Sequence, residues 1–282
     1  MSSTHQSNCP AVILIPLYKL ELSESELFSV QLTLKTLKNY PISIACPASL
    51  KKDFQSLVTT WDHLQISVDA FADHYFLSIA GYNRLLKSKF FYEHYAKYEY
   101  MLIAQPDALI LSDQLEKWCH ARFSYIGAPF FEGFTNPTHP LKMIGVGNGG
   151  ISLRRIPDFI KAASHIRYIP NTRAPFPSSI FSPYELGRFI KHRLIFCVNL
   201  WPLFPQVNED VYWGILVPQH FDFFKIPSSK EAIAFAFDAE PRFLYQQNHQ
   251  TLPFACHAWE RYDYAFWKDI LSAQGIHIPN KK

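Results

Sequence analysis

Short apolar runs alternate with amphipathic stretches along the first third of the chain. The run at residues 11–16 is rich in β-branched side chains and ends at a proline, which predicts a buried strand. Ser23 and Glu26 then have the spacing of a helix-capping box, and apolar residues recur at helical intervals from Leu27 to Leu37. A second strand is expected over residues 42–47. Because strand–helix–strand connections are right-handed crossovers, this unit predicts two parallel neighbours in one sheet.

The same patterns continue through the rest of the chain with more interruptions. Predicted helices cover residues 50–61, 79–95, 115–119 and 157–163, and predicted strands cover 66–68, 98–104, 125–129 and 232–237. Proline-containing loops are expected at residues 131–140 and 168–183. Strands that alternate with helices indicate an α/β domain. No G-x-G-x-x-G turn follows the first strand and no P-loop is present, so these nucleotide-binding fingerprints are absent.

The run at residues 98–104 is apolar enough for a strand buried on both faces of a sheet. Pro106 cannot donate a hydrogen bond to a neighbouring strand, so the strand should end before it. Asp107 is then expected at the carboxyl end of a central strand, where open α/β sheets bind their ligands. A carboxylate there suits a hard cation that bridges to phosphates. The alternative is that Asp107 only caps the turn after the strand.

Glycine is concentrated at one place in the chain. Four of the ten glycines lie within residues 145–150, around Asn148 and including Gly149 and Gly150. Such density permits unusual backbone angles and lets a ligand approach the main chain, whose N–H groups can bind an anion or a sugar hydroxyl. The alternative is a plain glycine-rich hairpin.

Five further residues, in three stretches of the chain, are candidates for chemistry. Arg84 lies with Lys87 on a predicted helix just before the central strand, and it either reaches a diphosphate or belongs to a solvated face. Glu209 and Asp210 precede an aromatic helix start, as an N-terminal cap or as a general base. His257 stands in an apolar, aromatic stretch, where a histidine is either a core residue or a ligand.

Composition narrows the class of protein. The chain has 282 residues, 48% of them apolar, which suits one large α/β domain with a sizeable core. The net charge of +3 is spread over mixed acids and bases, which argues against a nucleic-acid partner. Five scattered cysteines predict no disulfide framework and favour the reducing cytoplasm. No secretory signal and no membrane-spanning run is seen, although peripheral contact with a membrane stays open.

Several motifs, taken in order, resemble a bacterial family first catalogued as a domain of unknown function. That family is regarded as glycosyltransferase-like and is often linked to surface-polysaccharide genes. The most specific matching stretches are residues 81–84, 105–108, 125–129, 147–154 and 208–210. Their order is also similar to that of GT-A glycosyltransferases, which have a nucleotide-binding sheet, an Asp-x-Asp metal motif, a glycine-rich acceptor-side loop, an acidic catalytic motif and often a late histidine ligand.

The resemblance implies a role for each candidate. Asp107 stands where the last aspartate of the metal motif is expected, while Gln105 replaces the first aspartate and leaves the site one carboxylate short. His257 would complete a site for manganese or magnesium. Three alternatives follow from the missing carboxylate: Gln105 binds through its carbonyl or binds the ribose, or the metal is held more weakly, or no metal is used. Asp210, rather than Glu209, would be the catalytic base. The expected sugar- and diphosphate-binding residues are Arg84, Lys87, Asn148, Gly149, Gly150 and Trp213.

The sequence therefore predicts a single GT-A-like, Rossmann-like domain over residues 10–270, after a disordered segment at 1–9 and before a tail at 271–282. Residues 10–120 would form the nucleotide-binding half, and 121–270 the acceptor-side half. The expected activity is that of a cytoplasmic glycosyltransferase, either free or at the inner face of the membrane, that moves a sugar from a nucleotide-sugar donor to a glycan or lipid-linked acceptor. Two alternatives remain: a non-catalytic nucleotide- or sugar-binding protein, and a hydrolase that uses the carboxylate pair.

Overall fold

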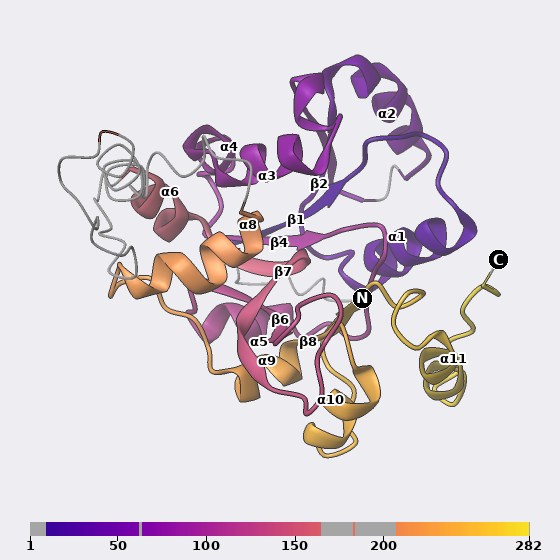
Figure 1. The fold of residues 1–282 in the computed structure, drawn as a ribbon. Coiled ribbons are helices and arrows are strands. Elements are labelled where there is room, and N and C mark those ends of the chain that lie inside the picture. The colour runs from indigo at the N-terminus through magenta and orange to yellow at the C-terminus, as the bar shows by residue number, and fades with distance from the viewer. Residues whose placement is uncertain (1–9, 62–63, 165–182, 184–206, 282) are drawn as a thin grey trace.

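The computed structural model describes residues 10–61, 64–164, 183 and 207–281, and its centre is a mixed sheet of six strands (Figure 1). The strand order is β3-β2-β1-β4-β7-β6. The first four strands in this order are parallel, and β7 runs antiparallel to both β4 and β6. The strands are β1 (Ala11–Pro16), β2 (Ile42–Pro47), β3 (Ile66–Phe71), β4 (Tyr100–Ala104), β6 (Tyr125–Phe131) and β7 (Met143–Arg155).

Both faces of this sheet are covered, because its central strands are apolar at every position. In β1, Ile13 and Ile15 point into one core cluster, while Val12 and Leu14 point into another. The first cluster includes residues of α1 (Glu24–Thr36), α2 (Lys51–Val58) and α5 (Leu115–His120). The second includes residues of α3 (Ile79–Lys87), α4 (Lys89–His94) and α6 (Ile156–Ser164). The predicted mixed α/β fold, with helices flanking a central sheet, is confirmed.

Local signals predicted the early elements well. The strands at 11–16 and 42–47 are found with those bounds, they pair in parallel, and α1 begins with the capping box of Ser23 and Glu26. The single helix expected over 79–95 is instead two helices, because Ser88 adopts an extended conformation between them. The short helical turns η1 (Ala48–Leu50), η2 (Thr59–Trp61) and η3 (Asp73–Tyr75) complete this half.

The strand expected at residues 232–237 is wrong for most of its length. A capping box formed by Ser228 and Glu231 starts the helix α9 (Ser229–Phe235), and only β8 (Ala236–Phe237) is extended. β8 belongs to a second sheet of three strands in the order β5-β9-β8, with β5 (Ala108–Ile110) and β9 (Ala255–His257). The β5–β9 pairing sets Ala108 opposite His257, and so brings the end of the chain to the end of β4.

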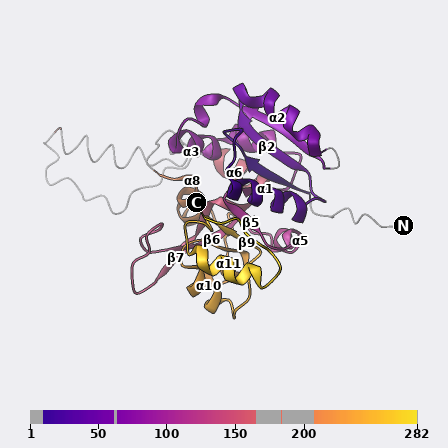
Figure 2. The ribbon, with the colours of Figure 1, turned by 90° about the vertical axis from the view of Figure 1, so that its right-hand side faces the viewer.

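The elements after residue 207 lie in two places. The helix α8 (Glu209–Val211) leads into the π-helical turn η5 (Tyr212–Leu216) and η6 (Val217–Gln219), which contribute to the second core cluster with α3, α4 and α6. The helices α10 (Pro241–Gln247) and α11 (Tyr264–Ser272) lie near β6 and β9 and contribute to a third cluster with residues of β5, β8 and β9 (Figure 2). In the described part of the chain, no helix has the length and apolar character needed to cross a membrane. Cys46 and Cys256 are buried free thiols.

Candidate active site

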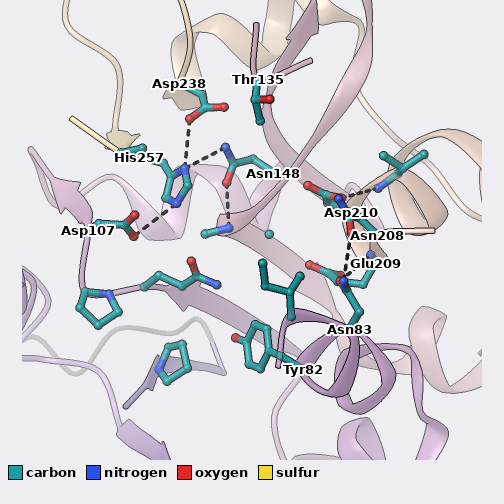
Figure 3. Close-up of a pocket in the computed structure, with 18 of the residues that line it drawn as sticks. Tyr82, Asn83, Asp107, Thr135, Asn148, Asn208, Glu209, Asp210, Asp238 and His257 are labelled. Atoms are coloured by element: carbon teal, nitrogen blue, oxygen red, sulfur yellow. Dashed lines mark hydrogen bonds and ion pairs between the residues drawn. The ribbon is translucent and has the colours of Figure 1, made fainter. Parts of the chain in front are cut away.

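A cleft of about 880 Å³ opens where β1 and β4 end, and most of the predicted site residues line it (Figure 3). Pro16 and Gln105 contribute from the ends of these two strands. This is the carboxyl edge of the parallel strands, where ligands bind in open α/β sheets. The volume falls within the range of small-molecule sites. The predicted residues that line it are Gln105, Asp107, Asn148, Gly149, Gly150, Glu209, Asp210 and His257.

His257 lies between two carboxylates on one side of the cleft (Figure 3). Its Nε2 is 3.3 Å from Oδ1 of Asp107, and its Nδ1 is 3.0 Å from Oδ1 of Asp238. An ionised carboxylate can only accept a hydrogen bond, so the Nδ1 hydrogen points to Asp238, and this contact fixes the orientation of the ring. The amide nitrogen of Asn148, 3.2 Å from the same Nδ1, packs beside it. Nε2 therefore faces Asp107.

The two carboxylates dominate the charge of this histidine. Burial alone would disfavour the imidazolium, but Asp107 and Asp238 outweigh it and raise the pKa of His257 to about 10. Burial would raise the pKa of Asp107, but the charge of His257 lowers it. Without a cation, the ground state is thus an imidazolium between two carboxylates.

The same residues fit a divalent cation. Nε2 of His257 is buried and makes no hydrogen bond within the described residues. An octahedral ion with bonds of about 2.1 Å keeps adjacent ligand atoms about 3 Å apart, close to the separation of this Nε2 and Asp107 Oδ1. Asp238 would orient the ring from behind, as carboxylates do for metal-bound histidines. No cluster of three or more His, Cys, Asp or Glu ligands occurs in the described ranges, so phosphates and water would supply the remaining ligands.

Glu209 faces the cleft but is tied into the core. It is 2% exposed, and its Oε1 accepts a hydrogen bond of 2.8 Å from Arg154, which is itself fully buried. Arg154 also donates to Ser152 (3.0 Å) and to the hydroxyl of Tyr92 (2.9 Å). Burial raises the pKa of Glu209, and Arg154 opposes this shift. A carboxylate held in this way is a poor candidate for a base that must move a proton.

Asp210 is the freer of the two acids. It lines the cleft, is partly exposed, and has no ion pair among the described residues. Oδ1 accepts the backbone N–H of Val211 at 2.8 Å, and the backbone N–H of Gly149 also bonds to the carboxylate. Burial raises the pKa of Asp210 against these hydrogen bonds and the charge of Arg154. A carboxylate with a raised pKa, facing a cleft, has the properties of a general base.

Asn83 holds the start of α8, the helix that carries both acids, and it was not chosen from the sequence, although it lies in a stretch that carried the resemblance. Its side-chain oxygen accepts the backbone N–H of Glu209 at 2.9 Å, and its nitrogen donates to Asn208 at 3.1 Å. Asn208 makes no side-chain cap of its own, so Asn83 on α3 satisfies the start of α8. Asp238 was missed as well. It follows directly after β8, so the only signal was an acid at a strand end.

The glycine-rich stretch is part of β7, where it forms a large bulge. Gly127 of β6 pairs with Ser152 of β7, but Ala128 pairs with Gly147, so residues 148–151 are extra on β7. Asn148 has a φ of 103°, and its side-chain oxygen accepts the N–H groups of Gly150 (2.8 Å) and Ile151 (3.2 Å). The asparagine side chain thus holds the shape of the bulge.

The glycines leave room for protein side chains more than for a ligand. A Cβ on Gly150 would lie 2.0 Å from Nε2 of His257, and one on Gly149 would lie 2.7 Å from Oε1 of Glu209. Both functional side chains therefore pack directly on this backbone. The sequence suggested either a ligand-binding backbone or a plain glycine-rich hairpin, and neither interpretation included close packing of protein side chains as the reason for the glycines.

Three predicted ligand-binding residues lie outside the cleft lining. Arg84 is exposed on α3. Lys87 is buried and donates from Nζ to the carbonyl of Val207 at 2.8 Å, and burial lowers its pKa. Trp213 is fully buried in the aromatic core, with its indole N–H bonded to the carbonyl of Leu86 at 3.0 Å. These positions do not support contacts with a ligand in the cleft, and the proposals below do not use them.

Residues 65–257 match the sequence profile of the family described as Protein of unknown function (DUF5672), and the chain belongs to this family. No curated protein sequence matches the chain.

Several solved structures are similar in part. They include core-mannan synthase A from Aspergillus fumigatus in a Mn/GDP form (14% identity, 46% of this chain and 45% of that chain, TM-score 0.35). TarS 1–349 of S. aureus in complex with UDP-GlcNAc is 14% identical over 56% of this chain and 48% of that chain, with a TM-score of 0.34. The mannosyltransferase Ktr4p from S. cerevisiae in complex with GDP is 10% identical over 80% and 68%, with a TM-score of 0.41. The chain spans about half the length of the first two. At these TM-scores the likenesses say nothing of activity.

Proposed function

We propose that the protein is a glycosyltransferase that moves a sugar from a nucleotide-sugar donor to a hydroxyl of a glycan or lipid-linked acceptor, in the assembly of a surface polysaccharide. The observation that carries the proposal is that one cleft contains two separate groups, one suited to a cation and a diphosphate and the other suited to proton transfer. The Asp107–His257–Asp238 array fits a cation and a diphosphate, and Asp210 is a separate, partly buried carboxylate without an ion pair in the described residues. Glycosyl transfer from a nucleotide sugar needs both parts.

The donor diphosphate is assigned to the side of the cleft with Asp107 and His257. A divalent cation bound there would neutralise charge on the leaving diphosphate. Asp238 holds the His257 ring so that Nε2 faces Asp107, and the ring must give up its Nε2 proton to become a ligand. Gln105 lines the same cleft, and we assign its amide to a hydrogen bond with the donor.

The acceptor is assigned to the side with Asp210. As the acceptor oxygen forms its bond to the anomeric carbon, the bond between that carbon and the diphosphate oxygen breaks, and the diphosphate leaves with the electron pair. The hydroxyl proton passes to the Asp210 carboxylate. Asn83 and the Arg154–Glu209 pair hold the start of α8 and so keep Asp210 in place, but they take no part in the proton transfer themselves.

The release of nucleoside diphosphate from a panel of nucleotide sugars, with manganese present, tests this proposal. Wild-type protein should release it from donors of one base class, with water as a slow acceptor. Asp210→Asn should abolish release while leaving nucleoside diphosphate binding nearly intact. Asp222→Asn makes the same chemical change at an exposed position outside the cleft and is the matched control. Equal release by Asp210→Asn and wild type would remove Asp210 from the role of base.

The rival function is non-catalytic binding of a nucleotide or sugar. Gln105 in place of an acid favours it, because the cation site has one carboxylate fewer than a paired-aspartate motif. Under that reading, wild-type protein binds a nucleoside diphosphate but releases none from any donor.

A further inference from the structure

We propose that Arg261 binds the diphosphate of the nucleotide ligand, an inference that rests on the proposed function. Among the described residues, Arg261 is the only lysine or arginine that lines the cleft. Its position was not expected from the sequence, which pointed to Arg84 for this role. Arg84 is exposed on α3 and is absent from the cleft lining.

The excess of acidic side chains in the cleft explains why a diphosphate would need a positively charged side chain there. Five carboxylates line it: Glu26, Asp107, Glu209, Asp210 and Asp238. Glu26 is paired with Lys19 at 2.8 Å, Glu209 is paired with Arg154 at 2.8 Å, and two more share His257. Lys19, Arg154 and His257 therefore already neutralise acids of the protein itself. A diphosphate adds further negative charge, so its binding calls for positive groups that the protein does not already use.

The guanidinium of Arg261 meets that need. In the part of the chain that the structure describes, it makes no hydrogen bond or ion pair, and its one cation–ring contact is with the adjacent Tyr262 at 5.1 Å. Other arginines are engaged: Arg155 pairs with Glu99 and Asp158, and Arg242 pairs with Asp263. Arg261 is exposed, so binding a phosphate removes less water than it would from a buried site.

The backbone of Arg261 is held close to the proposed cation site. The turn after β9 begins at Ala258, whose φ is 49° and whose N–H donates to the carbonyl of Asp107 at 3.0 Å. The N–H of Arg261 donates to the carbonyl of Ala258 at 2.9 Å. At the other end of the turn, the hydroxyl of Tyr262 donates to the carbonyl of Thr135 at 3.2 Å. The turn is thus fixed to Asp107 at one end and to the β6–β7 loop at the other.

Arginine suits this ligand better than lysine does. Its planar guanidinium presents paired N–H groups that match two phosphate oxygens at once. A cation bound by Asp107 and His257 would neutralise one part of the diphosphate, and Arg261 would hold another. The long side chain gives the reach, while the fixed turn limits where the charge can go.

Calorimetric titration of the full chain with UDP and GDP, in the presence of manganese, tests the assignment. Arg261→Ala should weaken binding of the preferred diphosphate on the order of tenfold or more, the usual effect of losing a charged hydrogen bond. The affinity of Arg261→Lys for the diphosphate should lie between those of wild type and Arg261→Ala, because lysine keeps the charge but cannot make the paired hydrogen bonds. Affinity for the matching nucleoside, measured by competition, should stay unchanged, since a nucleoside has no phosphate. The melting temperature of the ligand-free variants should match wild type, because the side chain is exposed.

Arg84→Ala is the matched arginine control and should bind like wild type. Unchanged diphosphate affinity in Arg261→Ala, or a loss in Arg84→Ala in its place, would overturn the assignment while leaving the proposed function standing. Equal loss of nucleoside and diphosphate affinity in Arg261→Ala would also overturn it, because the effect would then be structural. Failure of wild-type protein to bind any nucleoside diphosphate would sink the proposed function and this inference together.

Discussion

The buried Arg154–Glu209 pair offers a sharp test of how the site is supported. Arg154→Met removes three hydrogen bonds from a fully buried guanidinium and leaves the Glu209 carboxylate in the core without its partner. Breaking a buried ion pair by removing one member costs about 3–5 kcal/mol. We therefore expect Arg154→Met to lower the free energy of unfolding by about that amount, a large part of the stability of an ordinary domain.

The pH dependence of this loss has a definite sign. Burial already raises the pKa of Glu209 above its unfolded value, and Arg154 opposes that shift. Without Arg154 the pKa rises further, so the folded state binds the proton more tightly than the unfolded state does. Stability is then retained below the unfolded pKa and lost as pH rises through the folded pKa. Arg154→Met should be less destabilised near pH 5 than near pH 8.

The reverse variant should behave differently. Glu209→Gln leaves a buried guanidinium, which cannot give up its proton at these pH values, so this site should no longer make the stability of the variant depend on pH. The double variant should lose less than the sum of the two single losses, because the pair acts as a unit. Urea unfolding at both pH values measures all three. A loss under about 1 kcal/mol in Arg154→Met, or no difference between the two pH values, would refute the buried ion pair as the support of α8.

Further predictions concern the cleft. Gly150→Ala should displace His257, because the new Cβ would lie 2.0 Å from Nε2, and manganese should then no longer enhance nucleotide binding in calorimetry. Asn83→Ala should cost about 1–2 kcal/mol of unfolding free energy through loss of the α8 cap, and should lower turnover more than nucleotide affinity. Asp238→Asn should weaken manganese binding by about 10- to 100-fold without unfolding the protein, as seen by titration with the metal alone. Because burial raises the pKa of Asp210, turnover should fall with acid at a higher pH than an exposed aspartate would allow, and a rate unchanged down to pH 4 would contradict its role as base.

Much of the central sheet was predictable because its signals are local. The strands at 11–16 and 42–47 and the Ser23–Glu26 capping box each depend on a few neighbouring residues. The proline after the central strand likewise placed Asp107 at the sheet edge, and Asp107 does line the cleft there. Short-range chemistry was enough for these elements.

The rest depends on contacts between distant parts of the chain. The β5–β9 pairing joins Ala108 to His257, and Arg154 meets Glu209 across 55 residues. Neither separation leaves a periodic signal in the sequence. Trp213 shows the same limit, since an aromatic residue next to the acidic pair fits a sugar platform or a core equally well, and tertiary packing put it in the core. Asp238 and Arg261 carried no pattern that distinguished them from other surface charges.

The most direct test of the central claim is the thermal stability of the protein against UDP, GDP, ADP and dTDP, with and without manganese. A ligand that binds only the folded state raises the melting temperature. The proposed function predicts a shift with one nucleotide that is larger with manganese and is lost in Asp107→Asn. No shift with any nucleotide under either condition would contradict it.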